Sequence, residues 1–114
     1  MEDNNSFSDE IIAVCAVNAT LKTDGVFEMA GGVYDTISKN LLGIENLVRG
    51  TKVSRNGDET RIDISIIARY GCNIPSVAWE IQENVRKEIK EMVNIDVSAV
   101  NINVQGVEMS EEKI

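Results

Sequence analysis

The sequence predicts an α+β domain in which a small sheet, made of a β-hairpin and a C-terminal strand, packs against one long amphipathic helix and N-terminal helices. Three observations predict this class. Two strand-like runs flank Asn56-Gly57, a dipeptide typical of tight hairpin turns. Residues 75–93 repeat apolar side chains at helical spacing. A segment ending near residue 105 alternates apolar and polar side chains, as a half-buried strand does.

The first element is predicted to be a helix over about residues 9–23. Ser8 can cap its N-terminus, and Asp9 and Glu10 would lie in its first turn, where the helix dipole favours negative charge. Gly25 would follow its end. A strand is the alternative, because the apolar run is rich in β-branched residues. The end signals favour a helix buried on most of its circumference.

A short amphipathic helix is predicted next, over about residues 33–42 and ended by Gly43. Gly31-Gly32 precedes it and could present backbone N–H groups to an anion. No phosphate-binding motif accompanies these glycines. A turn is their ordinary use, and it is the interpretation that we favour.

The hairpin is predicted from residues 51–55 and 60–70, with Asn56-Gly57 as its two-residue loop. That loop places Val53 opposite Thr60. Alternate residues of the second strand then share a face with Val53, and polar residues take the other face. The inward set is Ile62, Ile64, Ile66, Ala68 and Tyr70; the outward set is Arg61, Asp63, Ser65 and Arg69.

The clearest amphipathic helix covers residues 75–93 and opens at Pro75, whose missing N–H costs nothing in a first turn. Charged residues occupy the rest of its surface. Its predicted apolar stripe consists of Val77, Ile81, Val85, Ile89 and Met92.

The last strand is predicted to follow Asn94 and to run to about residue 105. Val100, Ile102 and Val104 point inward, and Asn101, Asn103 and Gln105 point outward. Ile95 and Val97 are out of phase with this alternation. A bulge or bend is therefore expected at the start of the strand.

Composition excludes several classes of function. The 114 residues include no histidine, which removes imidazole catalysis and histidine-ligated metals. The net charge is −8, which argues against nucleic acid and against direct binding to an anionic membrane surface. The longest strongly apolar run is Ile11 to Val17, far below the roughly 20 residues of a transmembrane helix. We expect no direct membrane insertion.

The chain is predicted to form a single domain over residues 8–107, with a disordered tail over residues 1–7 and an acidic tail over residues 108–114. The N-terminus lacks the basic region of a signal peptide. Cys15 and Cys72 are too few for a disulfide framework. A cytoplasmic protein with reduced thiols is expected.

No catalytic, cofactor-binding or metal-binding residue is predicted. The glutamates of the long helix are typical of a solvated face with i,i+4 charge pairs, although paired carboxylates can also serve acid/base or metal chemistry. Cys15 lies in an apolar run and is predicted to be a core residue. Cys72 precedes a helix N-terminus that can stabilise a thiolate, but the sequence offers no histidine to act as its base.

The candidate interface consists of Trp79, Asn101, Asn103 and Gln105. Trp79 falls about 120° from the centre of the apolar stripe. It either covers a second element of the same chain or lies in an interface, where Trp is enriched. The outward amides could pair laterally with another subunit, or form a wetted sheet face.

Several segments together carry a resemblance. They are Asp24-Gly25-Val26, Met29-Ala30-Gly31-Gly32, Tyr70-Gly71 with Ile74-Pro75-Ser76-Val77-Ala78, Ile81-Gln82-Glu83-Asn84-Val85, and the stretch from Val100 to Val107. This ordered set, over about residues 8–107, resembles the alkaline shock protein family of envelope stress response proteins from Gram-positive bacteria.

The resemblance implies a small cytoplasmic α+β protein without known catalysis. It also implies self-association as a homo-oligomer and tethering beneath the membrane by a separate anchor protein. We therefore expect a non-enzymatic envelope stress response protein, with no cofactor, that docks to a membrane-anchored partner. The alternatives are a small-ligand-binding module and a thiol-dependent enzyme accessory.

Overall fold

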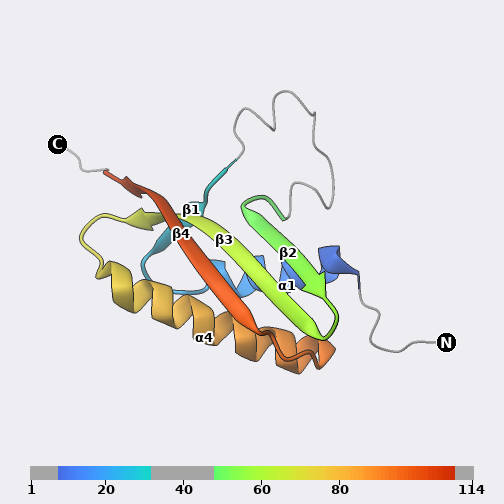
Figure 1. Cartoon of the computed structure of the whole chain (residues 1–114). Helices are drawn as coiled ribbons and strands as arrows, with labels where there is room; N and C mark the ends of the chain where they lie inside the picture. Colours follow the sequence, from blue (N-terminus) through green and yellow to red (C-terminus); the bar gives the residue numbers. More distant parts are fainter. Residues whose placement is uncertain (1–7, 32–47, 110–114) are drawn as a thin grey trace.

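The computed structural model describes residues 8–31 and 48–109. In this part of the chain two helices pack on one face of a four-stranded sheet (Figure 1), which confirms the predicted α+β class. The short helix predicted over residues 33–42 lies outside the described residues. The elements are α1 (Asp9–Leu21), β1 (Val26–Met29), β2 (Thr51–Asn56), β3 (Glu59–Arg69), α4 (Ile74–Val93) and β4 (Ala99–Glu108).

Helix α1 forms where the capping signals place it, and not as a strand. The side chain of Ser8 accepts a hydrogen bond from the backbone N–H of Ile11. The helix ends at Leu21, two residues before the predicted end. There the buried hydroxyls of Thr20 and Thr23 donate back to the carbonyls of Ala16 and Ala19, respectively. Most of the helix circumference is buried, as expected.

Strand β1 was not predicted from the sequence. Val26 pairs with Ala68 and Glu28 pairs with Ile67, so Phe27 is an extra residue in the ladder. This bulge breaks the apolar/polar alternation that identifies strands. Four residues with an interrupted alternation give too weak a pattern to detect.

The hairpin is confirmed, but its loop lies one residue later than predicted. Asn56 pairs with Glu59, so the loop is Gly57-Asp58 and Val53 faces Ile62 instead of Thr60. Gly57 has a φ of +63°, and a glycine at the first loop position is typical of a type II′ turn. Moving the loop by one residue shifts each pair by two positions, so every side chain keeps its predicted face.

Strand β3 is the centre of the sheet. It pairs antiparallel with β1 through residues 66–68 and with β2 through residues 59–64. It pairs in parallel with β4 along residues 61–69. Because a strand has only two edges, β1 and β2 share one edge of β3, and β4 occupies the other. Helix α4 makes the crossover that a parallel pair needs.

Helix α4 begins at an Asn73 cap, whose side-chain oxygen accepts from the backbone N–H of Ser76. Two residues assigned to the core are exposed instead. Met92 is 64% exposed because Val93 takes the last buried position of the stripe. Tyr70 is 70% exposed because β3 ends at Arg69, before the chain turns towards α4.

Strand β4 is longer than predicted and reaches Glu108. The expected bulge is present but lies elsewhere. Ile66 pairs with Val104 and Ile67 with Gly106, so Gln105 is the extra residue. Ile95 and Val97 precede the strand, and this explains why they are out of phase with it.

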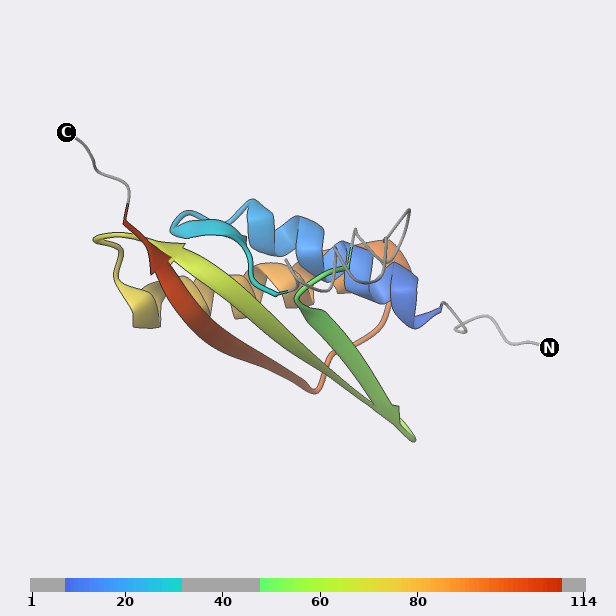
Figure 2. The same cartoon turned by 90° about the horizontal axis from the view of Figure 1, so that it is seen from above.

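The core lies between the sheet and the two helices. Helices α1 and α4 run side by side over the same face of the sheet (Figure 2). The largest fully buried apolar side chains are Ile12, Ile62, Ile64, Ile66, Ile81, Val85 and Ile89. No described helix covers the other face, which we call the open face. Its residues include Arg61, Asp63, Ser65, Ile67 and Arg69 of β3 and Asn101, Asn103 and Gln105 of β4.

Candidate functional site

Trp79 lies on the solvent side of α4. It is 61% exposed, so no element within residues 8–31 and 48–109 buries it. Gln82, one turn further along α4, donates from Nε2 to the carbonyl oxygen of Val100 at 2.9 Å. Residues 79 and 82 are about 60° apart around a helix. Trp79 is therefore on the flank of α4 that faces β4, turned further out towards solvent.

The three amides of β4 lie on the open face and are all exposed, as predicted. Asn101 Nδ2 donates to Asp63 Oδ1 at 2.9 Å across the parallel pair. Trp79 belongs to the helix layer, on the other side of the sheet. The structure therefore does not join the four predicted interface residues into one patch. It places them on opposite sides of the same strand, β4.

The outer edge of β4 connects these residues, and it was not predicted from the sequence. In the described part of the chain β4 pairs with β3 alone. One long edge of β4 therefore faces away from the sheet. Trp79 lies on one side of this edge and the three amides lie on the other. The only sequence signal of this edge is a run from Val97 to Val107 without a charged residue.

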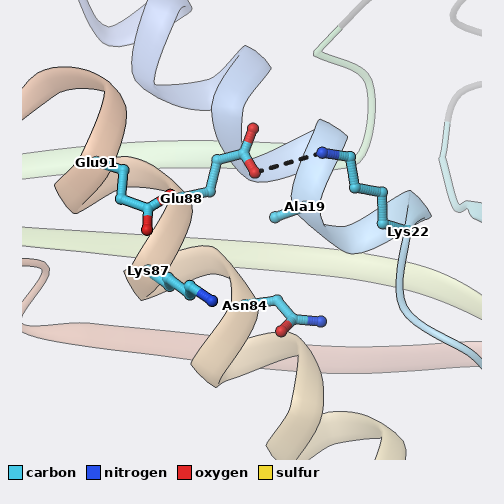
Figure 3. Close-up of a pocket in the computed structure, with 6 residues that line it drawn as sticks. All are labelled: Ala19, Lys22, Asn84, Lys87, Glu88 and Glu91. Atoms are coloured by element: carbon cyan, nitrogen blue, oxygen red, sulfur yellow. Dashed lines mark ion pairs between the residues drawn. The ribbon is translucent and has the colours of Figure 1, made fainter.

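A small groove of about 270 Å³ separates α1 from α4 (Figure 3). The carboxylate of Glu88 interacts with two residues that line or border this groove. Its Oε2 accepts a hydrogen bond from Asn18 Nδ2 at 2.8 Å, and its Oε1 lies 3.6 Å from Lys22 Nζ. Asn18 lies in α1 and Lys22 caps its C-terminus, so this carboxylate links the two helices. Residues 8–31 and 48–109 contain no group of three or more Cys, Asp or Glu side chains placed to hold a metal ion. The groove is lined by Ala19, Lys22, Asn84, Lys87, Glu88 and Glu91.

Gly31 has a φ of +108°, which suits the turn interpretation of the glycine pair. The backbone N–H of Ala30 donates to the carbonyl of Ser65 at 2.8 Å, and the N–H of Ser65 donates to the carbonyl of Gly50 at 2.8 Å. The two chain segments at Ala30 and Gly50 are therefore anchored to the same residue of β3. Gly32 and the helix predicted after it lie outside the described residues.

The two thiols differ in environment. Cys15 is buried in α1, and burial raises its pKa above the ordinary value of 9.0, with a smaller contribution from the charge of Glu88. A thiol that stays protonated is a poor nucleophile. Cys72 is partly buried, just before α4.

We expect native-state alkylation at pH 8 to modify Cys72 and to leave Cys15 unmodified until the chain unfolds. The raised pKa also makes the protonated thiol the stable form in the fold. The stability that the protonated Cys15 thiol contributes to the fold is complete below pH 9. It is lost as the pH rises through the pKa of Cys15 in the folded state. Mass spectrometry after timed labelling measures both sites, with a urea-unfolded sample as the control. Equal labelling of the two cysteines in the native protein would contradict this assignment.

Neither described helix has the length and apolar character that a membrane crossing requires. A family model matches residues 2–109, nearly the whole chain; it is that of the alkaline shock protein 23 family, described as having a cell envelope-related function. No solved structure gives a significant match.

Three relatives illustrate the similarity. The YloU protein of Bacillus subtilis is 34% identical over 105 residues, which cover 90% of this chain and 87% of the relative. The YqhY protein of the same organism is 32% identical over 99 residues, with coverages of 87% and 73%. A stress response regulator gls24 homolog of Streptococcus pyogenes is 25% identical over 107 residues, with coverages of 94% and 60%.

Proposed function

Because this chain belongs to the alkaline shock protein 23 family, a family with a cell envelope-related function, we propose that it is a non-enzymatic envelope stress response protein that works through protein contacts. It associates with copies of itself and docks to a membrane-anchored partner. The name of the streptococcal relative, a stress response regulator homolog, supports the stress-related part of this role. The family membership confirms the resemblance drawn from the sequence motifs.

The exposure of Trp79 is the observation that carries the proposal. A tryptophan offers a large apolar area, and such residues are usually buried in the fold or in an interface. Here 61% of Trp79 remains accessible on a helix whose apolar stripe is already buried against the sheet and α1. Contact with another protein would remove this surface from water.

The proposed location is the cytoplasm, with attachment to the membrane through the partner. The acidic chain, with a net charge of −8, is repelled by anionic lipid headgroups. A protein anchor avoids this repulsion, because the lipid contact is then made by another chain.

Replacing Trp79 by alanine is expected to weaken self-association and partner capture by roughly tenfold or more, as loss of an interface tryptophan typically does. Light scattering over a concentration series measures self-association. Crosslinking followed by pull-down from membrane fractions measures partner capture. Met92→Ala is the matched control, because Met92 is a similarly exposed apolar residue of the same helix. The proposal fails if the wild-type chain is monomeric at high micromolar concentration and Trp79→Ala leaves its partners unchanged.

A further inference from the structure

Among the strands that the structure describes, none pairs with the outer edge of β4, whose backbone groups follow a defined pattern. The N–H groups of Ser65 and Arg69 donate to Gly50 and Gly25, on the side of β1 and β2. Backbone groups alternate in direction along a strand, so the even-numbered residues of β3 bond towards β4. Their register partners in β4 then turn their own N–H and C=O groups away from β3. These partners are Val100, Ile102 and Val104.

One of these outward groups already has a partner. The carbonyl of Val100 accepts the hydrogen bond from Gln82 of α4, which shows that it is directed outside the sheet. Ile102 and Val104 come next along the same edge. Each offers one donor and one acceptor there, with no described strand beside them.

The side chains along this edge do not protect it. Exposed edges usually carry charges or proline, which prevent pairing with another chain. Strand β2, at the opposite edge of the sheet, follows that rule with Lys52 and Arg55. Strand β4 has neither type of residue before Glu108. In a chain of net charge −8, an uncharged strand is a place where two copies can approach with little repulsion.

We propose that β4 pairs antiparallel with β4 of a second copy about a twofold axis at Asn103, which would join two four-stranded sheets into one. This inference rests on the self-association in the proposed function and assigns a surface to it. Ile102 of each copy exchanges backbone hydrogen bonds with Val104 of the other. The interaction forms four hydrogen bonds and leaves the bond between Gln82 and Val100 intact.

The amides on the open face favour a second copy of this chain as the partner that pairs with the outer edge of β4. In this register Asn103 faces its own equivalent, and Asn101 faces Gln105. An amide both donates and accepts hydrogen bonds, so an amide can pair with an amide, whereas a charged residue at the axis would face its own charge. The amide row is therefore self-complementary, and an isologous twofold contact requires that property.

Trp79 flanks the same contact from the helix layer. Helix α4 runs antiparallel to β4, and Trp79 lies one turn from Gln82, which is bonded at Val100. One turn of helix spans about the length of one to two strand residues. Trp79 is thus near the level of Ile102, close to the proposed axis, where the helix layer of the second copy would cover it.

Charge substitution at the axis tests the pairing. Asn103→Lys and Asn103→Asp each place two like charges opposite one another, and each is expected to raise the dissociation constant of self-association at least roughly tenfold. An equimolar mixture of the two variants is expected to restore association, because opposite charges then meet. Analytical ultracentrifugation of each variant and of the mixture measures the effect. Emission of Trp79, the only tryptophan, reports its burial in the same samples.

Matched controls separate this contact from a general charge effect. Ser54 is exposed on the open-face side of β2, at the other edge of the sheet. Ser54→Lys and Ser54→Asp are expected to leave association unchanged. As an independent readout, Asn103→Cys in a Cys72→Ser background is expected to form a disulfide-linked dimer on mild oxidation, and Ser54→Cys in the same background is not. Facing residues of this type lie about 4.5 Å apart between Cα atoms, within disulfide reach.

The outcomes are distinguishable. Three results together support the pairing: loss of association in both single Asn103 variants, rescue in their mixture, and a disulfide-linked dimer with Asn103→Cys but not with Ser54→Cys. If the wild-type chain associates while the Asn103 variants associate equally well, the edge contact is overturned and self-association is not. If the wild-type chain is monomeric at high micromolar concentration, the edge contact and the self-association of the proposed function both fail.

Discussion

Replacing Gly50 by alanine is expected to lower the free energy of unfolding by at least about 3 kcal/mol. Gly50 has a φ of +83°, a conformation that side chains rarely adopt. A Cβ there would also lie 2.6 Å from the carbonyl oxygen of Ala30 and 3.0 Å from that of Ser65. Both obstacles are backbone atoms, so no side-chain rotation can relieve them.

Gly71→Ala is the matched control for this prediction. Its φ of +85° is nearly the same, but a Cβ at Gly71 would meet nothing within 4 Å. We expect a loss of about 1–2 kcal/mol from the backbone conformation alone. Urea denaturation followed by circular dichroism gives both values. Equal losses in the two variants would show that the close approach at Ala30 and Ser65 does not restrict residue 50.

Replacing Ile81 by alanine is expected to lower the free energy of unfolding by about 2–5 kcal/mol. Its side chain is 0% exposed and lies in the middle of the α4 stripe, inside the core cluster. Truncation removes buried apolar surface and leaves a cavity that the surrounding isoleucines cannot fill without moving.

Met92→Ala on the same helix provides the comparison, since Met92 is 64% exposed. We expect a change of no more than about 0.5 kcal/mol. Thermal and urea unfolding of both variants, each under two-state conditions, give the difference. A loss at Met92 that matches the loss at Ile81 would mean that the end of α4 is buried in solution.

Most of the fold follows from local patterns. The Ser8 cap and Pro75 predict where the two helices begin, to within a residue for α4, and the period of the apolar residues predicts which side of α4 is buried. The hairpin illustrates why the prediction tolerates an error: its loop is one residue off, yet the faces are right because the pairs shift by two. Met92 and Tyr70 were wrongly assigned to the core. The period of the apolar residues indicates which side of a helix or strand faces the core. It does not indicate whether a neighbouring element is long enough to cover the residues at its end.

The candidate site was less predictable. The departure of Trp79 from the apolar stripe and the outward direction of the amides are local properties, and both follow from spacing. The edge of β4 is a property of strand order. Which strand β4 joins, and in which direction, depends on the crossover through α4 and on β1, which carried almost no signal. The residues on the two flanks of this edge could therefore be predicted from the sequence, whereas the edge itself could not.

The central position of β3 has a consequence for how the chain folds and unfolds. Strands β1, β2 and β4 each pair with β3 and with no other strand in the described part of the chain. The hairpin with β2 is local and can close early, whereas β4 must wait until α4 has formed and returned the chain. Fraying of β1, β2 or β4 removes the backbone hydrogen bonds of one strand pair. Disruption of β3 removes the hydrogen bonds of all three strand pairs at once. Cooperativity among the described strands is therefore concentrated in a single eleven-residue segment, β3.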